Sequence, residues 1–116
     1  MKLEFLFVPT TDLSASLALY RDGLGFTELW REGDATVALT LPGTDVQLML
    51  DANDPSAPPG PLFVVDSVET FHGGRPGTLT VLDGPSEIPG GFLATYQEPG
   101  GGTIYVMDQL TDGATG

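Results

Sequence analysis

The sequence VPTTDLSASLALYRDGLGF, residues 8–26, contains the signals that decide the fold of this chain. Pro9 ends a β-rich run, and Asp12 stands where its carboxylate can accept the first free N–H groups of a helix. Two glycines near the end of the stretch are typical of a helix C-terminus. Between these signals, apolar side chains recur at helical spacing: Leu13, Leu17 and Tyr20. The stretch therefore predicts a strand, a turn and one helix over residues 12–22.

Outward from this helix, short alternating runs separated by Gly, Pro and Asp predict strands. In the first half, the expected strands are residues 3–8, 26–31, 35–41 and 46–50. The sequence DANDPSAPPG, residues 51–60, can only form a loop, and the pattern restarts after it. The second half is expected to contain strands at 61–65, 78–82, 92–97 and 103–107, a short helix at 67–72, a turn-rich loop at 83–91 and a frayed end from Asp108.

Both halves thus have the order strand, helix, strand, strand, strand, an internal repeat of about 55 residues. One such half leaves a sheet face and a helix face uncovered, and two halves can bury those faces together. The predicted fold class is α+β, built from two βαβββ modules. We expect a single domain over residues 1–116, with module one at 1–55, module two at 60–108 and a flexible tail at 109–116.

Composition narrows the classes of partner. The chain has sixteen carboxylate side chains and four basic residues. The net charge of −12 repels phosphate backbones, so no nucleic-acid partner is expected. The chain has no cysteine, which removes disulfides and thiolate chemistry. No apolar run approaches the about 20 residues of a membrane span, and the N-terminus lacks the layout of a signal peptide. We therefore expect a cytoplasmic protein without a membrane partner.

Three short motifs resemble the vicinal oxygen chelate superfamily, which includes glyoxalase I, extradiol dioxygenases and bleomycin-resistance proteins. The motifs are residues 8–20, Leu24-Gly25-Phe26 and the glycine-rich turn at 98–102. The resemblance implies a curved mixed sheet that surrounds a cup, with the helices on the outside. It also implies a homodimer, because chains with two modules in this family usually pair with a second copy.

The resemblance also identifies the positions that hold a metal ion in metal-dependent members. Those members use His, Glu or Gln from two strands of each module, and here the positions fall on Phe5, Gln47, Gly60 and Tyr105. Phe and Gly offer no side-chain ligand atom, and a phenol or an amide is a poor ligand for a divalent cation. The only imidazole, His72, is expected on or after the short helix as an ordinary surface or capping residue. We therefore predict no metal and no cofactor.

Strand alternation indicates what such a cup contains instead. The predicted ligand-binding residues are aromatic or thioether side chains with an amide and a phenol for orientation: Phe5, Phe7, Trp30, Gln47, Met49, Tyr105 and Met107. Alternation leaves the face of Trp30 undecided. A mostly apolar surface with a few polar groups is typical of small-molecule sites. The alternative interpretation is that these side chains are plain core.

Two functions remain open. The favoured one is a metal-free binding protein that sequesters a cationic or aromatic, antibiotic-like small molecule, as bleomycin-resistance proteins do. The alternative is an enzyme, a lyase, isomerase or dioxygenase, which without a metal would have to use Glu4, Asp51 or Tyr105. We predict no specific catalytic residue, since Ser14 and Ser16 have no basic partner nearby in the sequence.

Overall fold

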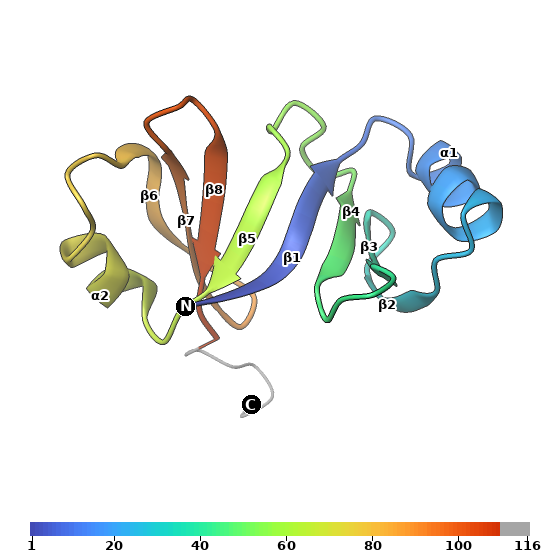
Figure 1. Cartoon of the computed structure of the whole chain (residues 1–116), viewed down its shortest axis with the longest axis horizontal. Helices are drawn as coiled ribbons and strands as arrows, with labels where there is room; N and C mark the ends of the chain where they lie inside the picture. Colours follow the sequence, from blue (N-terminus) through green and yellow to red (C-terminus); the bar gives the residue numbers. More distant parts are fainter. Residues whose placement is uncertain (110–116) are drawn as a thin grey trace. The chain divides into compact units, whose positions relative to one another are not determined.

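The computed structural model describes residues 1–109, and the chain divides into two compact units. Module one is Glu4–Pro59; module two is Met1–Leu3 together with the chain from Gly60 onward. Each module is a four-stranded mixed sheet with one helical segment (Figure 1). The two modules repeat the order βαβββ, which confirms the predicted α+β fold class.

The sheet of module one has the strand order β2-β3-β4-β1. β1 and β4 are parallel, whereas β3 is antiparallel to both of its neighbours. In chain order, the elements are β1 (Lys2–Pro9), α1 (Leu13–Leu17), η1 (Ala18–Gly23), β2 (Glu28–Glu32), β3 (Thr36–Thr40) and β4 (Gln47–Asp51).

The helix of module one begins as predicted but ends differently. Asp12 caps it, since its Oδ1 accepts a hydrogen bond from the backbone N–H of Ala15 at 3.0 Å. The expected single α-helix is wrong beyond Leu17, because the chain widens into the π-helix η1. In this wider turn, an N–H donates to the carbonyl five residues earlier, as the N–H of Leu24 does to the carbonyl of Leu19 at 2.8 Å. Gly25 then takes a φ of +80°, which only glycine adopts without strain.

One face of the sheet in module one carries the core. Aliphatic side chains from α1, β3 and β4 are buried together there: Leu17, Val37, Leu39, Leu48 and Leu50. Partly buried neighbours, including Leu6 and Val8 of β1, pack against them. This face is therefore the helix side of module one, and the opposite face carries the alternate residues of each strand.

Module two has the strand order β5-β8-β7-β6, with β5 parallel to β8 and the other neighbours antiparallel. Its core also lies between sheet and helix, and its buried members are Val68, Ala94, Tyr96 and Val106. In chain order, the elements are β5 (Gly60–Val64), α2 (Val68–Gly73), β6 (Thr80–Ile88), β7 (Gly91–Gln97) and β8 (Thr103–Met107).

Two expectations for module two are wrong. Residues 83–91 are not mainly a loop, because β6 continues to Ile88 through irregularities at Asp83 and Ser86. β6 has only one neighbour within its module, and such an edge strand tolerates bulges and a proline, here Pro85. Asp108 is not frayed: it is 1% exposed and hydrogen-bonded. Of the predicted flexible tail, residues 110–116 lie outside the described residues.

Among residues 1–109, no helix is both long enough and apolar enough to cross a membrane.

Candidate functional site

The face of module one opposite the helix gathers five of the seven predicted ligand-binding residues. Cross-strand register places Phe5 beside Gln47 and Phe7 beside Met49. Leu6 and Val8 point to the helix side, so strand alternation turns these four side chains the other way. We call this surface the helix-free face of module one; its members used below are Phe5, Phe7, Trp30, Thr36, Gln47, Met49 and Asp51.

Trp30 lies on this face in a fixed orientation. Its Cα partner is Ala38 on β3, yet its indole Nε1 donates a hydrogen bond to Oε1 of Gln47 on β4 at 2.9 Å. The ring therefore extends across β3. It also meets Phe5 edge to face, with ring centroids 6.1 Å apart and an angle of 89° between the planes. Trp30 remains 36% exposed, whereas Phe5 is 7% exposed, so the indole offers ring surface to solvent while its polar edge is satisfied.

A second hydrogen-bonded group on the same face surrounds Asp51. Its Oδ1 accepts from Oγ1 of Thr36 at 3.0 Å, from the backbone N–H of Asn53 at 3.1 Å and from Nδ2 of Asn53 at 2.7 Å. Strand alternation places Asp51 on the same face as Gln47 and Met49, but the sequence did not identify Thr36 as its partner. The signal that reveals Thr36 is its position opposite Asp51 in the ladder between β3 and β4.

The other two predicted residues belong to module two. Tyr105 pairs with Leu62 and Thr95, and Met107 lies two residues further along β8. Val106, between them, is in the core under α2, so Tyr105 and Met107 point to the helix-free side of module two. Tyr105 is buried.

The four positions where the family resemblance implies metal ligands are filled as follows. Phe5 and Gln47 are cross-strand neighbours in module one. In module two, a side chain at Gly60 would overlap the backbone carbonyl of Thr103 and lie 3.6 Å from the ring of Tyr105. A ligand side chain at position 60 is therefore sterically blocked. Within residues 1–109, no three His, Cys, Asp or Glu side chains come close enough together to hold a metal ion.

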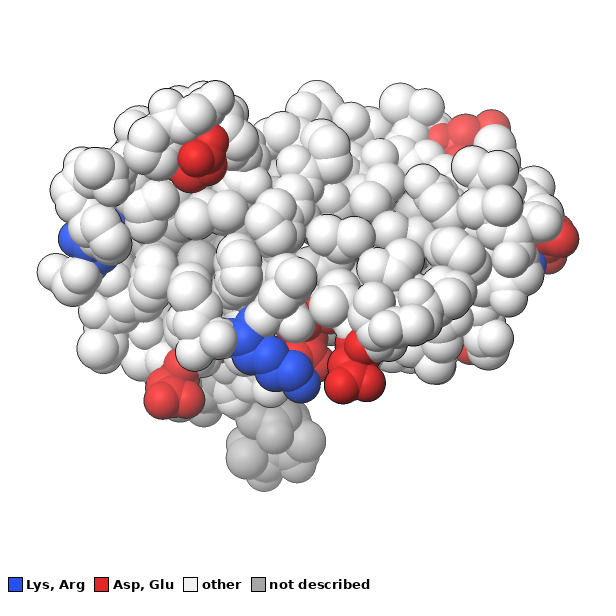
Figure 2. Space-filling view, viewed as in Figure 1, with Lys and Arg blue, Asp and Glu red and all other residues white. Residues whose placement is uncertain are grey.

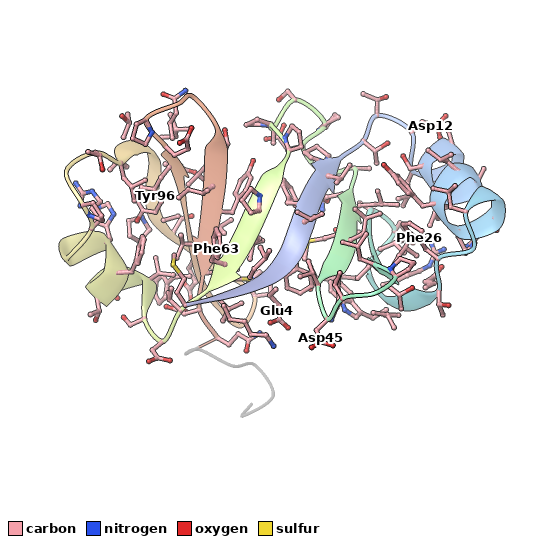
Figure 3. The ribbon with its side chains drawn as sticks, in the orientation of Figure 1. Glu4, Asp12, Phe26, Asp45, Phe63 and Tyr96 are labelled. Atoms are coloured by element: carbon pink, nitrogen blue, oxygen red, sulfur yellow. The ribbon has the colours of Figure 1, made fainter. Side chains whose placement is uncertain are left out.

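His72 lies on the helix side of module two. It occupies the last turn of α2, and its Nδ1 is 2.8 Å from the hydroxyl of the fully buried Tyr96 (Figure 3 labels Tyr96). Burial raises the pKa of Tyr96, and the nearby positive charge of Arg75 partly opposes this. Sequence reasoning missed this pair. The alternation of Phe92, Ala94 and Tyr96 could have predicted that the phenol of Tyr96 points into the core, but not that it meets His72.

Glu4 does not join Asp51 on one surface. It precedes Phe5 in β1 and so shares the orientation of Leu6 and Val8, on the helix side.

An open depression of about 350 Å³ lies elsewhere, beside the start of α2. It is lined by Met1, Val65, Asp66, Ser67, Thr70 and Phe71 and includes none of the predicted ligand-binding residues.

The fold and these positions define a two-module βαβββ protein. The model of the Glyoxalase/Bleomycin resistance protein/Dioxygenase superfamily matches residues 2–104, so the chain belongs to this superfamily. That result confirms the resemblance drawn from the helix and turn motifs. No curated protein matches the sequence significantly.

Solved structures share the fold at low sequence identity. An NAD-dependent benzaldehyde dehydrogenase from Legionella pneumophila is 13% identical with a TM-score of 0.70, covering 90% of this chain and 97% of its own. Methylmalonyl-CoA epimerase from Mycobacterium tuberculosis is 16% identical with a TM-score of 0.60, covering 99% and 92%. TnmS3, an antibiotic binding protein from Streptomyces sp. CB03234, is 25% identical over 94% and 96%, but its TM-score of 0.42 is too low to support an inference. The first two likenesses establish the fold and leave the function to the site.

Proposed function

We propose that this protein binds a small, flat, apolar or cationic molecule on the helix-free face of module one, without a metal and without chemistry. The observation that carries the proposal is the fixed but exposed indole of Trp30. Gln47 satisfies the indole N–H and Phe5 supports the ring from its edge, so the ring is oriented before any ligand arrives. Such preorganisation reduces the entropic cost of binding.

The chemistry around Trp30 suits a planar ligand. An exposed indole face attracts aromatic rings and cations, in the latter case through its negative quadrupole. Phe7 and Met49 lie next to each other on the same face and are only partly buried. The thioether of methionine adapts to irregular shapes. The surface around Trp30 is thus apolar with one amide that can orient a ligand, which is the usual composition of a small-molecule site.

The charge of the protein favours a cation over an anion. The net charge is −12, and Figure 2 shows carboxylates dispersed over the visible surface with wide uncharged areas between them. Such a surface attracts cations and repels phosphate-bearing ligands at low salt. Within this function, sequestration of an antibiotic-like cationic aromatic compound is the specific role we favour. We also expect a homodimer, which light scattering tests directly.

Trp30 is the only tryptophan, so its indole N–H provides one NMR signal at the proposed site. We would titrate the ¹⁵N-labelled protein with bleomycin, ethidium and 9-aminoacridine at low salt. A saturable shift of the indole signal with at least one of these compounds is expected. An indole signal that stays unchanged with all three, up to millimolar concentration, contradicts the proposal.

Calorimetry on two variants then localises the binding. Trp30→Leu removes the indole and is expected to weaken binding about tenfold, the scale of one well-placed aromatic contact. Leu29→Ala is the matched control, because Leu29 is the neighbouring exposed apolar residue on β2. Equal losses in the two variants would place the ligand elsewhere.

A further inference from the structure

We infer that Asp51 anchors a positively charged nitrogen of the ligand, so that the helix-free face of module one selects an aromatic amine over a neutral aromatic compound. The inference rests on the proposed function and adds a second contact point to the same face. Three observations carry it: where Asp51 lies relative to Trp30, how its carboxylate is held, and which oxygen remains available.

The strand register gives the helix-free face three rows. The first pairs Phe5 with Gln47, the second pairs Phe7 with Met49, and the third pairs Pro9 with Asp51. Rows lie two residues apart along a strand, so Asp51 is about 7 Å beyond Met49 and about 13 Å beyond Gln47. Because the indole of Trp30 reaches Gln47 in the first row, the aromatic contact and the carboxylate of Asp51 are separated by the apolar second row.

The carboxylate of Asp51 is held firmly. The backbone of Asp51 is fixed because its carbonyl accepts a hydrogen bond from the N–H of Thr10 at 2.9 Å. The carboxylate is fixed because its Oδ1 accepts three hydrogen bonds, one from Thr36 and two from Asn53. Thr36 is itself buried, at 7% exposure. A carboxylate held in this way loses little freedom when a ligand arrives.

The second oxygen of Asp51 remains available. None of residues 1–109 donates a hydrogen bond to Oδ2, and Asp51 is only half-buried. An ionised carboxylate can accept about four hydrogen bonds, so Oδ2 retains its capacity. A protonated amine that donates to it forms a charge-assisted hydrogen bond, which is stronger than the bond from a neutral hydroxyl.

A purely structural role makes a different prediction. The bond from the N–H of Asn53 to Asp51 closes a local turn, as aspartates commonly do. An asparagine at position 51 would keep an acceptor oxygen for the same donors and remove only the charge. Asp51→Asn therefore separates turn closure from recognition of a cation.

The experiment uses two probes of the same shape, 2-(2-naphthyl)ethylamine and 2-(2-naphthyl)ethanol. The indole N–H signal of Trp30 reports binding of both. We expect the amine to bind the unmodified protein about tenfold more tightly than the alcohol, which is the effect of one charge-assisted hydrogen bond. In Asp51→Asn the preference should vanish, with binding of the alcohol unchanged.

Glu69→Gln is the matched control, since it removes one negative charge from an exposed position on α2 in module two. Its amine preference should equal that of the unmodified protein. If Asp51→Asn does not fold, the ¹³C signal of the Asp51 carboxyl in the unmodified protein decides the matter: it should shift with the amine and not with the alcohol.

The outcomes distinguish the two proposals. Equal affinity for amine and alcohol in the unmodified protein, or a preference that survives in Asp51→Asn, overturns the inference and leaves the aromatic binding site standing. Failure of both probes to move the indole signal overturns the proposed function and the inference with it.

Discussion

The two modules share one strand order but hold their helices in different ways. In module one, α1 and η1 are packed on an aliphatic core that includes Leu17, Leu39 and Leu50. In module two, α2 has six residues, of which Val68 is buried and Phe71 packs against the apolar core. Polar groups also hold this helix. Asp108 accepts from the backbone N–H of Val68 at 2.7 Å, and His72 meets Tyr96 at 2.8 Å.

This difference shows how a repeated architecture can distribute its polar groups differently. A short helix buries too little apolar surface to be stable alone, so specific hydrogen bonds must compensate. Module two therefore places a carboxylate, a phenol and an imidazole on its helix side. In module one, the hydrogen-bonded groups of Trp30 and Asp51 lie on the helix-free face.

The largest expected effect comes from breaking the polar anchor of module two. Asp108 is 1% exposed and accepts from the N–H groups of both Val68 and Phe92. Asp108→Asn directs an amide NH₂ at one of these donors, which should cost about 3 to 4 kcal/mol of unfolding free energy. Urea denaturation measures this loss. Hydrogen exchange should show faster opening of the N–H of Phe71, which bonds the carbonyl of Ser67 within α2.

Asp66→Asn is the control for that experiment, because Asp66 is exposed and precedes the same helix. It should leave stability and exchange nearly unchanged. If Asp108→Asn behaves like Asp66→Asn, polar anchoring of α2 is refuted.

The corresponding change in module one removes aliphatic packing. Leu17→Ala should cost about 2 to 3 kcal/mol, the lower part of the range for truncating a buried leucine, since Leu17 is buried against β3 and β4. Exchange should accelerate at the N–H of Ser16, which bonds the carbonyl of Asp12. Leu19→Ala, at a position 52% exposed on the same helical segment, should leave the free energy of unfolding nearly unchanged. Comparable losses at both leucines would argue against this account of the core.

A smaller effect is expected at Tyr96. Tyr96→Phe leaves His72 without its phenol partner and should cost about 1 kcal/mol at neutral pH. Burial raises the pKa of Tyr96 above its usual value of 10.0, so the folded state holds the phenolic proton more tightly than the unfolded state. That stability is present below about pH 10 and is lost as the pH rises through the folded pKa.

Urea midpoints measured between pH 8 and pH 11 test the alkaline effect. The loss of stability above about pH 10 should be smaller in Tyr96→Phe than in the unmodified protein. Tyr20→Phe, which alters a half-buried tyrosine of module one, should retain it. An unchanged alkaline slope in Tyr96→Phe would show that other groups cause it.

The smallest effect concerns the exposed ion pairs of module one. Arg31 and Arg21 both contact the carboxylate of Glu28, at 2.7 and 3.1 Å, and the hydrogen bond from Arg31 is the main cause that lowers the pKa of Glu28. The resulting stability is present above the usual glutamate pKa and is lost as the pH falls through the lowered one. Glu28→Gln should thus slightly reduce the acid-side loss of stability.

The control for this change is Glu32→Gln, at an exposed position on the same strand. Urea midpoints between pH 3 and pH 6 at low and high salt measure both variants. The difference between them should shrink in high salt, because salt screens exposed pairs. A difference insensitive to salt would contradict an ionic origin.

Much of the fold could be predicted because its signals are local. Asp12 and Ser67 cap their helices with their own side chains, within three residues of the N–H groups they accept from. The strands follow from alternation, and the repeat of strand and helix signals identified the two modules. The exceptions are the π-helix η1 after Leu17 and the bulged continuation of β6, whose position at the sheet edge tolerates irregular pairing.

What the sequence determined by itself was the element order, the helix caps, the acidic charge and the family. Only the tertiary structure decided which polar groups meet. Trp30 reaches Gln47 across 17 positions, Asp51 meets Thr36 across 15, and Asp108 holds Val68 across 40. Such pairs depend on strand register and on the packing of elements far apart in the chain, and no local pattern of residues encodes them.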